Sequence, residues 1–136
     1  EAGDACKEAG AKRVVPLKVS GPFHSALLAE AGKKLGEALE DVTIQPITIP
    51  YLTNVTADYV TDISETKELL SKQVASSVRW QESMEKMIAE GVDTFVEIGP
   101  GKTLAGFMRK INRDVKMYNI GAWEDVDKVI EELRAD

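Results

Sequence analysis

The sequence predicts an α/β protein. Two short apolar runs typical of strands, TFVEI at residues 94–98 and KMYNI at residues 116–120, lie in its second half. Amphipathic segments with helical periodicity flank both runs, and similar segments occur in the first half. Strands that alternate with helices form sheets with parallel pairs and right-handed crossovers, so we expect a parallel sheet covered by helices.

The first half of the chain predicts two helices and a strand. Residues 1–10 are rich in Ala, Lys and Glu and predict a helix that Gly10 stops. RVVPLKV, residues 13–19, predicts a strand that Pro16 confines to a sheet edge or a bulge. After Gly21-Pro22, a helix of about four turns is expected from its spacing of apolar residues. These are Leu28, Ala31, Leu35, Ala38 and Leu39.

The middle of the chain predicts extended pieces followed by a helix. Residues 42–55 are divided by two prolines, and YLTNV at residues 51–55 is the best strand candidate there. Residues 62–74 begin with a capping box, Asp62 with Glu65, and continue as a helix.

The last third predicts three helices around the two strands. The first ends near Gly91, the second follows the tight turn GPGKT, and the third has acidic residues in its first turn. The strand at residues 94–98 is expected to be buried. The apolar faces of the three helices are Trp80, Met84, Met87 and Ile88; Leu104, Phe107, Met108 and Ile111; and Val126, Val129, Ile130 and Leu133.

Composition narrows the class of protein. The 136 residues suffice for one domain with its own core, and the net charge of −6 argues against a nucleic-acid partner. No apolar run approaches the ~18 residues that span a bilayer, and the N-terminal residues lack the pattern of a signal peptide. A lone Cys6 forms no internal disulfide, which fits a cytoplasmic protein. The chain begins at Glu1 inside an expected helix, which suggests a fragment.

Several kinds of site are disfavoured by the residues present. EIGPGKTL resembles a phosphate-binding loop, but the position five before Gly101 is Val96, so the loop is too short to surround a phosphate. One histidine and one cysteine, far apart, offer no metal cluster. No carboxylate pair has an apolar setting that would separate two pKa values.

His24 is the candidate catalytic residue. An imidazole exchanges protons near neutral pH, and Gly21-Pro22 together with the following helix gives it a rigid position. The adjacent Ser25 is not its nucleophile because neighbouring side chains diverge at a helix start. The chain has no G-x-S-x-G motif, and Cys6 lies in a short helix. A surface or packed histidine without catalytic function is the alternative.

Four linked motifs resemble one enzyme family. They are CKEAGAKRVVPLKVS, VSGPFHS, SKQVASSVRW and EIGPGKTLAGFMRKI, which begin at Cys6, Val19, Ser71 and Glu97. In order and spacing they resemble the C-terminal part of the malonyl-CoA:acyl carrier protein transacylases of bacterial fatty-acid synthesis. The resemblance covers nearly the whole chain.

The resemblance implies a fold and an activity. The fold would be the C-terminal part of an α/β-hydrolase-like acyltransferase large subdomain at residues 20–136. Residues 1–19 would be a remnant, the last helix and strand, of a ferredoxin-like small subdomain. The family transfers malonyl from coenzyme A to the phosphopantetheine thiol of acyl carrier protein through a seryl ester, without a cofactor. His24 would be the base, the Gln73 carbonyl would orient it, and Asn54 would line the same region.

This sequence departs from the family by lacking the serine elbow, the oxyanion-hole glutamine and the arginine that pairs with malonate. The partners implied are malonyl-CoA, acyl carrier protein and the missing N-terminal part of the enzyme, in the cytoplasm and without nucleic acid or membrane. The acidic carrier would dock on the basic pairs Lys12-Arg13 and Arg109-Lys110. Two alternatives remain open: a non-catalytic interaction module with the same fold, and a domain of a larger synthase.

Overall fold

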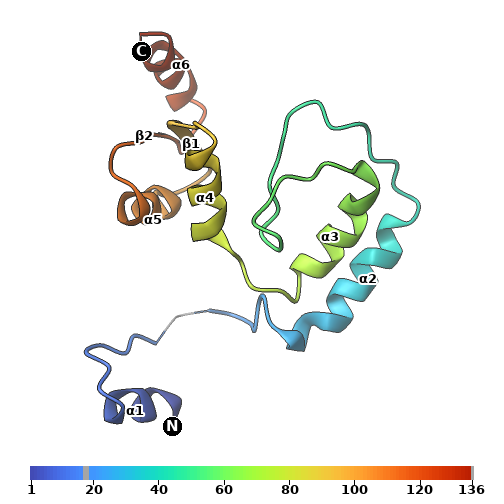
Figure 1. Ribbon diagram of the computed structural model, residues 1–136, viewed down its shortest axis with the longest axis vertical. Coiled ribbons are helices and arrows are strands. Elements are labelled where there is room, and N and C mark those ends of the chain that lie inside the picture. The colour runs from blue at the N-terminus through green and yellow to red at the C-terminus, as the bar shows by residue number, and fades with distance from the viewer. Residues whose placement is uncertain (17–18, 136) are drawn as a thin grey trace.

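The computed structural model describes residues 1–16 and 19–135, drawn in Figure 1. Six α-helices, two short 3₁₀ turns and two strands make up this part of the chain. In order they are α1 (Ala2–Glu8), η1 (Ala26–Leu28), α2 (Ala29–Leu39), η2 (Ile63–Glu65), α3 (Thr66–Gln73), α4 (Trp80–Ala89), β1 (Thr94–Ile98), α5 (Thr103–Ile111), β2 (Lys116–Ile120) and α6 (Asp125–Ala135).

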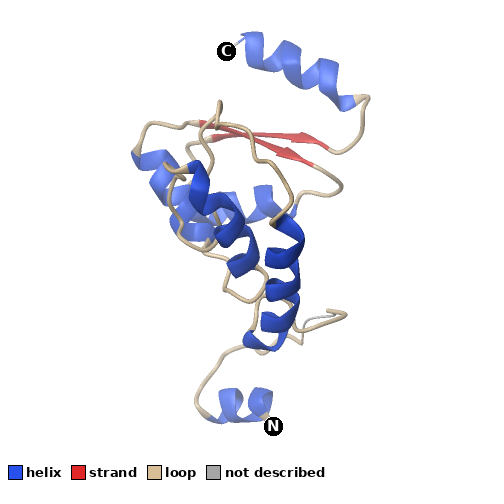
Figure 2. Cartoon of the chain, turned by 90° about the vertical axis from the view of Figure 1, so that its right-hand side faces the viewer, coloured by secondary structure: helices blue, strands red, loops and turns tan. Residues whose placement is uncertain are grey.

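The two strands form a parallel sheet, with α5 as the crossover between them. Their register pairs Thr94 with Lys116 and Ile98 with Ile120. Figures 1 and 2 show α6 on one side of the sheet and α4 and α5 on the other. Side chains alternate across a strand, so Glu97, which contacts α5, and Ile98 lie on opposite faces. The predicted α/β class and parallel pair are confirmed.

The helices α2 and α3 form a second, antiparallel unit. They approach closely at Gly32, where an added Cβ would lie 2.8 Å from the main-chain oxygen of Ser71. The Ser71 hydroxyl donates a hydrogen bond of 2.7 Å to the Gly32 carbonyl at the same point. This contact fixes the beginning of α2 beside the end of α3.

The buried core is small, and the sheet is covered only in part. Met108, on α5, is the most deeply buried large side chain, with 1% of its surface exposed. On β1, in contrast, 77% of Ile98 is exposed, so the prediction of a buried strand is wrong. The reason is that α6 packs on β2 and leaves the outer face of β1 open.

The six predicted helices are confirmed, while two of the predicted strands do not form. In the segment 13–19, the described residues 13–16 and 19 are irregular, and residues 17–18 lie outside the described part. YLTNV forms only a single bridge, between Leu52 and Tyr59. A strand needs a partner along its length, and in the described residues neither segment has a strand as its neighbour. None of the helices in residues 1–16 and 19–135 is long and apolar enough to cross a membrane.

Candidate active site around His24

His24 lies on a turn whose backbone is strained. It has φ of +56°, a left-handed conformation that costs a residue with a side chain roughly 1–2 kcal/mol. The neighbouring Ser25 hydroxyl donates a 2.7 Å hydrogen bond back to the Pro22 carbonyl, which closes the turn. Ser25 is therefore engaged with the main chain and does not present its oxygen to the imidazole.

The imidazole of His24 is held by a main-chain carbonyl. Its Nδ1 lies 3.1 Å from the carbonyl oxygen of Gln73. A carbonyl only accepts, so this contact requires the proton on Nδ1 and leaves Nε2 with a free lone pair. The ring is exposed, and its Nε2 is the basic nitrogen.

The end of α3 explains why this carbonyl is available. Gln73 is the last residue of α3, and the last carbonyls of a helix have no acceptor role within the helix ladder. The negative end of the helix dipole also faces the ring, which suits a group that takes up a proton. The packing of α2 on α3 brings His24 and Gln73 together across 49 residues of sequence.

Asn54 forms no hydrogen bond with His24. Its main-chain oxygen accepts a 3.0 Å hydrogen bond from the Arg79 N–H. The Arg79 guanidinium also donates a hydrogen bond of 2.7 Å to the Thr56 carbonyl. Arg79 therefore holds the loop that contains Asn54 and Thr56 against the start of α4. Sequence reasoning missed Arg79, because a side chain that binds main-chain oxygens leaves no pattern in the sequence.

An ion pair holds the same loop against α4 further along. Lys86 lies 3.1 Å from Asp58 and 3.3 Å from Glu90. The hydrogen bond from Lys86, helped by the Tyr59 N–H, holds the pKa of the Asp58 carboxyl below its ordinary value. The loop that carries Asn54 is therefore anchored at both ends of its turn.

The carboxylate of Glu97 organises the beginning of α5, after the GPGKT turn. The Glu97 carboxylate accepts hydrogen bonds from the N–H groups of Leu104 and Ala105, at 3.1 and 2.9 Å, and from the Asn119 amide at 2.8 Å. These donors, led by the Ala105 N–H, lower the pKa of Glu97. The N–H groups of Leu104 and Ala105, in the first turn of α5, are thus paired with a carboxylate of the chain itself.

We expect Glu97→Gln to lower stability at neutral pH, because the amide loses the charge that the α5 N–H groups favour. The pKa of Glu97 is lowered on folding, so its contribution is complete above the ordinary carboxyl pKa and is lost as pH falls through the lowered value. The stability difference between the two proteins should therefore shrink from pH 7 toward acid. Urea denaturation at several pH values measures it, with the exposed Glu131→Gln as control. A difference that stays constant with pH would contradict this account of the cap.

The four predicted docking residues are exposed but do not form one continuous patch. Lys12 and Arg13 follow α1, whereas Arg109 and Lys110 lie in the last turn of α5. Figure 1 shows α1 and α5 well separated along the long axis of the molecule. Within the described residues, Lys12-Arg13 and Arg109-Lys110 therefore form two separate basic patches.

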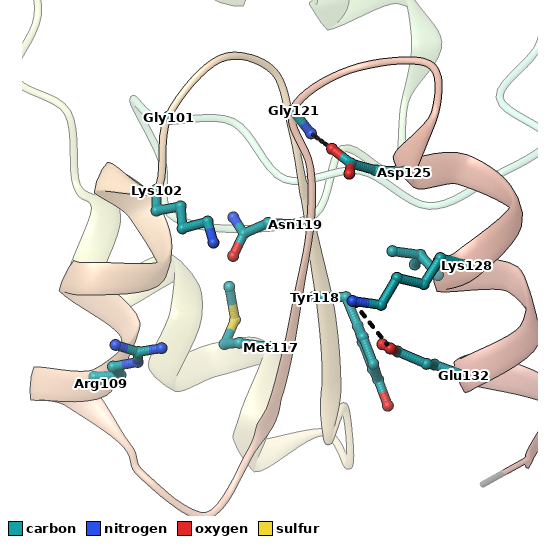
Figure 3. A pocket seen from close by; sticks show the side chains of 11 residues that line it. Gly101, Lys102, Arg109, Met117, Tyr118, Asn119, Gly121, Asp125, Lys128 and Glu132 are labelled. Carbon is teal, nitrogen blue, oxygen red and sulfur yellow. Dashed lines mark hydrogen bonds and ion pairs between the residues drawn. The ribbon is translucent and has the colours of Figure 1, made fainter.

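A charged pocket of about 400 Å³ lies along the outer edge of β2, between α5 and α6 (Figure 3). Lys102 and Arg109 project from the α5 side, and Lys128 and Glu132 face them from α6, 3.7 Å from each other. In residues 1–16 and 19–135, neither this pocket nor any other place holds a group of three His, Cys, Asp or Glu side chains arranged to bind a metal ion.

Solved structures define the class to which this fold corresponds. The malonyl CoA-acyl carrier protein transacylase of Clostridium perfringens superposes with a TM-score of 0.89 at 38% identity, over 98% of this chain and 42% of that one. A malonyl-transacylase solved in complex with its type II PKS acyl-carrier protein superposes with a TM-score of 0.88 at 34% identity, over 96% of this chain and 42% of that one. The fold is that of part of an acyltransferase.

Sequence comparison identifies the particular relatives. The malonyl CoA-acyl carrier protein transacylase of Bacillus subtilis strain 168 is 45% identical over 135 residues, 99% of this chain and 43% of that protein. The chain is thus a homologue of malonyl CoA-acyl carrier protein transacylases, and the resemblance found in the sequence is confirmed. It spans about two-fifths of the length of the curated relatives it matches. No protein-family model matches the chain.

Proposed function

We propose that this chain forms the general-base part of a malonyl-CoA:acyl carrier protein transacylase. The observation that carries the proposal is the hydrogen bond between His24 Nδ1 and the Gln73 carbonyl, which leaves Nε2 free to act as a base. The strained backbone at His24 supports the same role, because such strain is found preferentially at functional sites. Homology to the transacylases supplies the reaction and its substrates.

In the proposed reaction His24 moves one proton in each half. Nε2 takes the proton of a serine hydroxyl as its oxygen attacks the malonyl thioester, and then protonates the departing coenzyme A thiolate. In the second half Nε2 takes the proton of the phosphopantetheine thiol, whose sulfur attacks the seryl ester, and returns it to the serine oxygen. No cofactor takes part. The serine belongs to the portion of the relatives that this chain does not match.

The parts of the chain have different origins in this proposal. Residues 1–19 are the end of a ferredoxin-like small subdomain, and residues 20–136 are the C-terminal portion of the large subdomain. The exposed apolar side chains on the outer face of β1 support the second assignment, because such side chains are normally covered by another part of the same subdomain. We assign the complete enzyme to the cytoplasm, with malonyl-CoA and acyl carrier protein as its substrates, and Asn54 to the wall of the site.

The carrier protein would dock on the two basic patches, Lys12-Arg13 and Arg109-Lys110. Acyl carrier proteins are acidic and this chain carries a net charge of −6, so docking has to rely on local positive charge. In the described residues none of these four side chains forms an ion pair, so all four are available to a partner. The relative solved with its acyl-carrier protein supports a complex of this kind.

We expect reversal of all four charges to Glu to lower kcat/KM for the carrier protein about tenfold, since each rim charge is worth roughly 0.2–1 kcal/mol. The measurement uses the complete enzyme at low and high salt, and the salt dependence should disappear. Acylation by malonyl-CoA should stay near normal. Lys33→Glu with Lys34→Glu, on α2, is the charge control for each basic pair reversed separately, because each of these double variants changes the net charge by the same amount. An equal fall in both half-reactions would mean that these residues serve coenzyme A or the fold.

A further inference from the structure

The direction of the His24 imidazole depends on one carbonyl. The ring is exposed, and the Gln73 oxygen is the one partner with which its side chain forms a hydrogen bond in the part of the chain that the structure describes. An imidazole without such a partner populates both neutral tautomers, because either nitrogen can then bind water. The tautomer with the proton on Nδ1 is therefore favoured only as long as the peptide group of Gln73 keeps its direction.

Ser76 binds two consecutive carbonyls at the end of α3. Its hydroxyl donates a hydrogen bond of 2.7 Å to the Lys72 carbonyl, one turn back along the chain. Its main-chain N–H donates a longer hydrogen bond, of 3.3 Å, to the Gln73 carbonyl, which is the oxygen that His24 contacts. A carbonyl oxygen has two lone pairs, so it can accept from both residues. Ser76 is thus joined to the peptide group that orients the ring and to the one before it.

The turn after α3 depends on the Ser76 side chain. In the described stretch 74–78, the only other polar side chain is that of Ser77, and it forms no hydrogen bond. Besides the Ser76 N–H, the main chain adds one link, from the Ala75 N–H to the Lys72 carbonyl at 3.2 Å. Helix ends fray because their last carbonyls have no partner within the helix. The Ser76 hydroxyl supplies one of these partners and so keeps the last turn closed.

We propose that Ser76 is a positioning residue of the candidate site, which acts on the proton of His24 through the peptide group of Gln73. By closing the last turn of α3, its hydroxyl directs the Gln73 carbonyl at Nδ1 and so keeps Nε2 as the basic nitrogen. Without the hydroxyl, the turn opens and the ring loses its preference for the Nδ1–H tautomer. The inference rests on the proposed function, because the tautomer matters for a reaction only if His24 transfers protons.

The ¹⁵N signals of the imidazole give a direct test, because His24 is the only histidine of the chain. The 136-residue chain is labelled with ¹⁵N-histidine. At about pH 8.5, where an imidazole is neutral, the shifts of Nδ1 and Nε2 report the ratio of the two tautomers. The Nδ1–H form should predominate in the unsubstituted chain. In Ser76→Ala its ratio to the other form should fall about two- to tenfold, the range of a single hydrogen bond. An unchanged ratio would overturn the proposal.

Two serine variants separate positioning from general stability. Ser77→Ala removes a hydroxyl without a hydrogen bond from the same turn. Ser83→Ala removes the same kind of bond on α4, because the Ser83 hydroxyl donates 2.8 Å to the Arg79 carbonyl, four residues earlier. Ser83 is buried, so its variant should lose at least as much stability as Ser76→Ala in urea denaturation. Both controls should keep the tautomer ratio of the unsubstituted chain. An equal fall in Ser83→Ala would mean that general loosening moves the proton, and would overturn the proposal.

Malonyl transfer by the complete enzyme separates this inference from the proposed function. Ser76→Ala should lower kcat in proportion to the lost share of the Nδ1–H form, by at most about tenfold, and leave the KM for malonyl-CoA near normal. A tautomer ratio that falls as expected, in an enzyme whose transfer is insensitive to His24→Ala, would refute the proposed function alone. Loss of transfer in His24→Ala, with neither the ratio nor kcat changed in Ser76→Ala, would refute the positioning role alone.

Discussion

In the complete enzyme, His24→Ala should lower malonyl transfer to acyl carrier protein by about 10²- to 10⁴-fold. In the proposed reaction Nε2 serves both half-reactions as base and then as acid, so the rates of both should fall together. Release of coenzyme A in a single turnover measures the first half, and transfer from the preformed seryl ester measures the second. Binding of malonyl-CoA should change little, because His24 acts on protons and does not hold the substrate.

Gln73→Ala is the control variant that we compare with His24→Ala. The group that holds His24 Nδ1 is the main-chain carbonyl of Gln73, and alanine has the same carbonyl. We therefore expect a loss of less than about tenfold, within the range of a single hydrogen bond. If Gln73→Ala were as damaging as His24→Ala, the glutamine side chain would be orienting the ring and the tautomer argument would fail.

The 136-residue chain alone should transfer no malonyl above background, about 10⁶-fold below the complete enzyme. A base without its nucleophile has no hydroxyl to deprotonate, and the motif of the serine elbow does not occur in this sequence. Transfer of radiolabelled malonyl measures this, first with the chain alone and then after co-expression with the missing part. Transfer should appear only in the second case, and His24→Ala in the same pair is the negative control.

Two results would decide against this account of the chain. Malonyl transfer by the isolated chain would refute the assignment of the serine to the part of the enzyme that this chain does not match. A complex that forms but stays inactive, although its serine is intact, would favour the non-catalytic interaction module. Both outcomes are distinguished by measuring association and transfer in the same preparation.

The helices could be predicted from the sequence because the information that forms them is local. Apolar spacing and end signals such as Gly10 and Gly91, both of which adopt positive φ, lie within the helices or next to them. Strands depend on distant partners. Residues 94–98 and 116–120 form strands because they pair with each other, whereas residues 51–55 and the described part of 13–19 have no strand beside them.

The candidate site was predictable in part. The residue type alone indicated His24 as a candidate. Its contact with the Gln73 carbonyl was predicted only from the resemblance to a family, since every residue has a carbonyl. The role of Glu97 was missed, although a carboxylate inside the apolar run TFVEI is a signal that could have found it. The role of Arg79 had no such signal, because it depends on where the chain brings the Thr56 oxygen.

The contact at Gly32 has a consequence for the order in which the candidate site becomes organised. Both helices that position the imidazole belong to this chain, and there is no room for a Cβ between them. The conformational entropy of ordering His24 beside the Gln73 carbonyl is therefore lost when α2 and α3 pack together. In the proposed reaction, the imidazole would meet the serine with its tautomer and direction already set by these two helices.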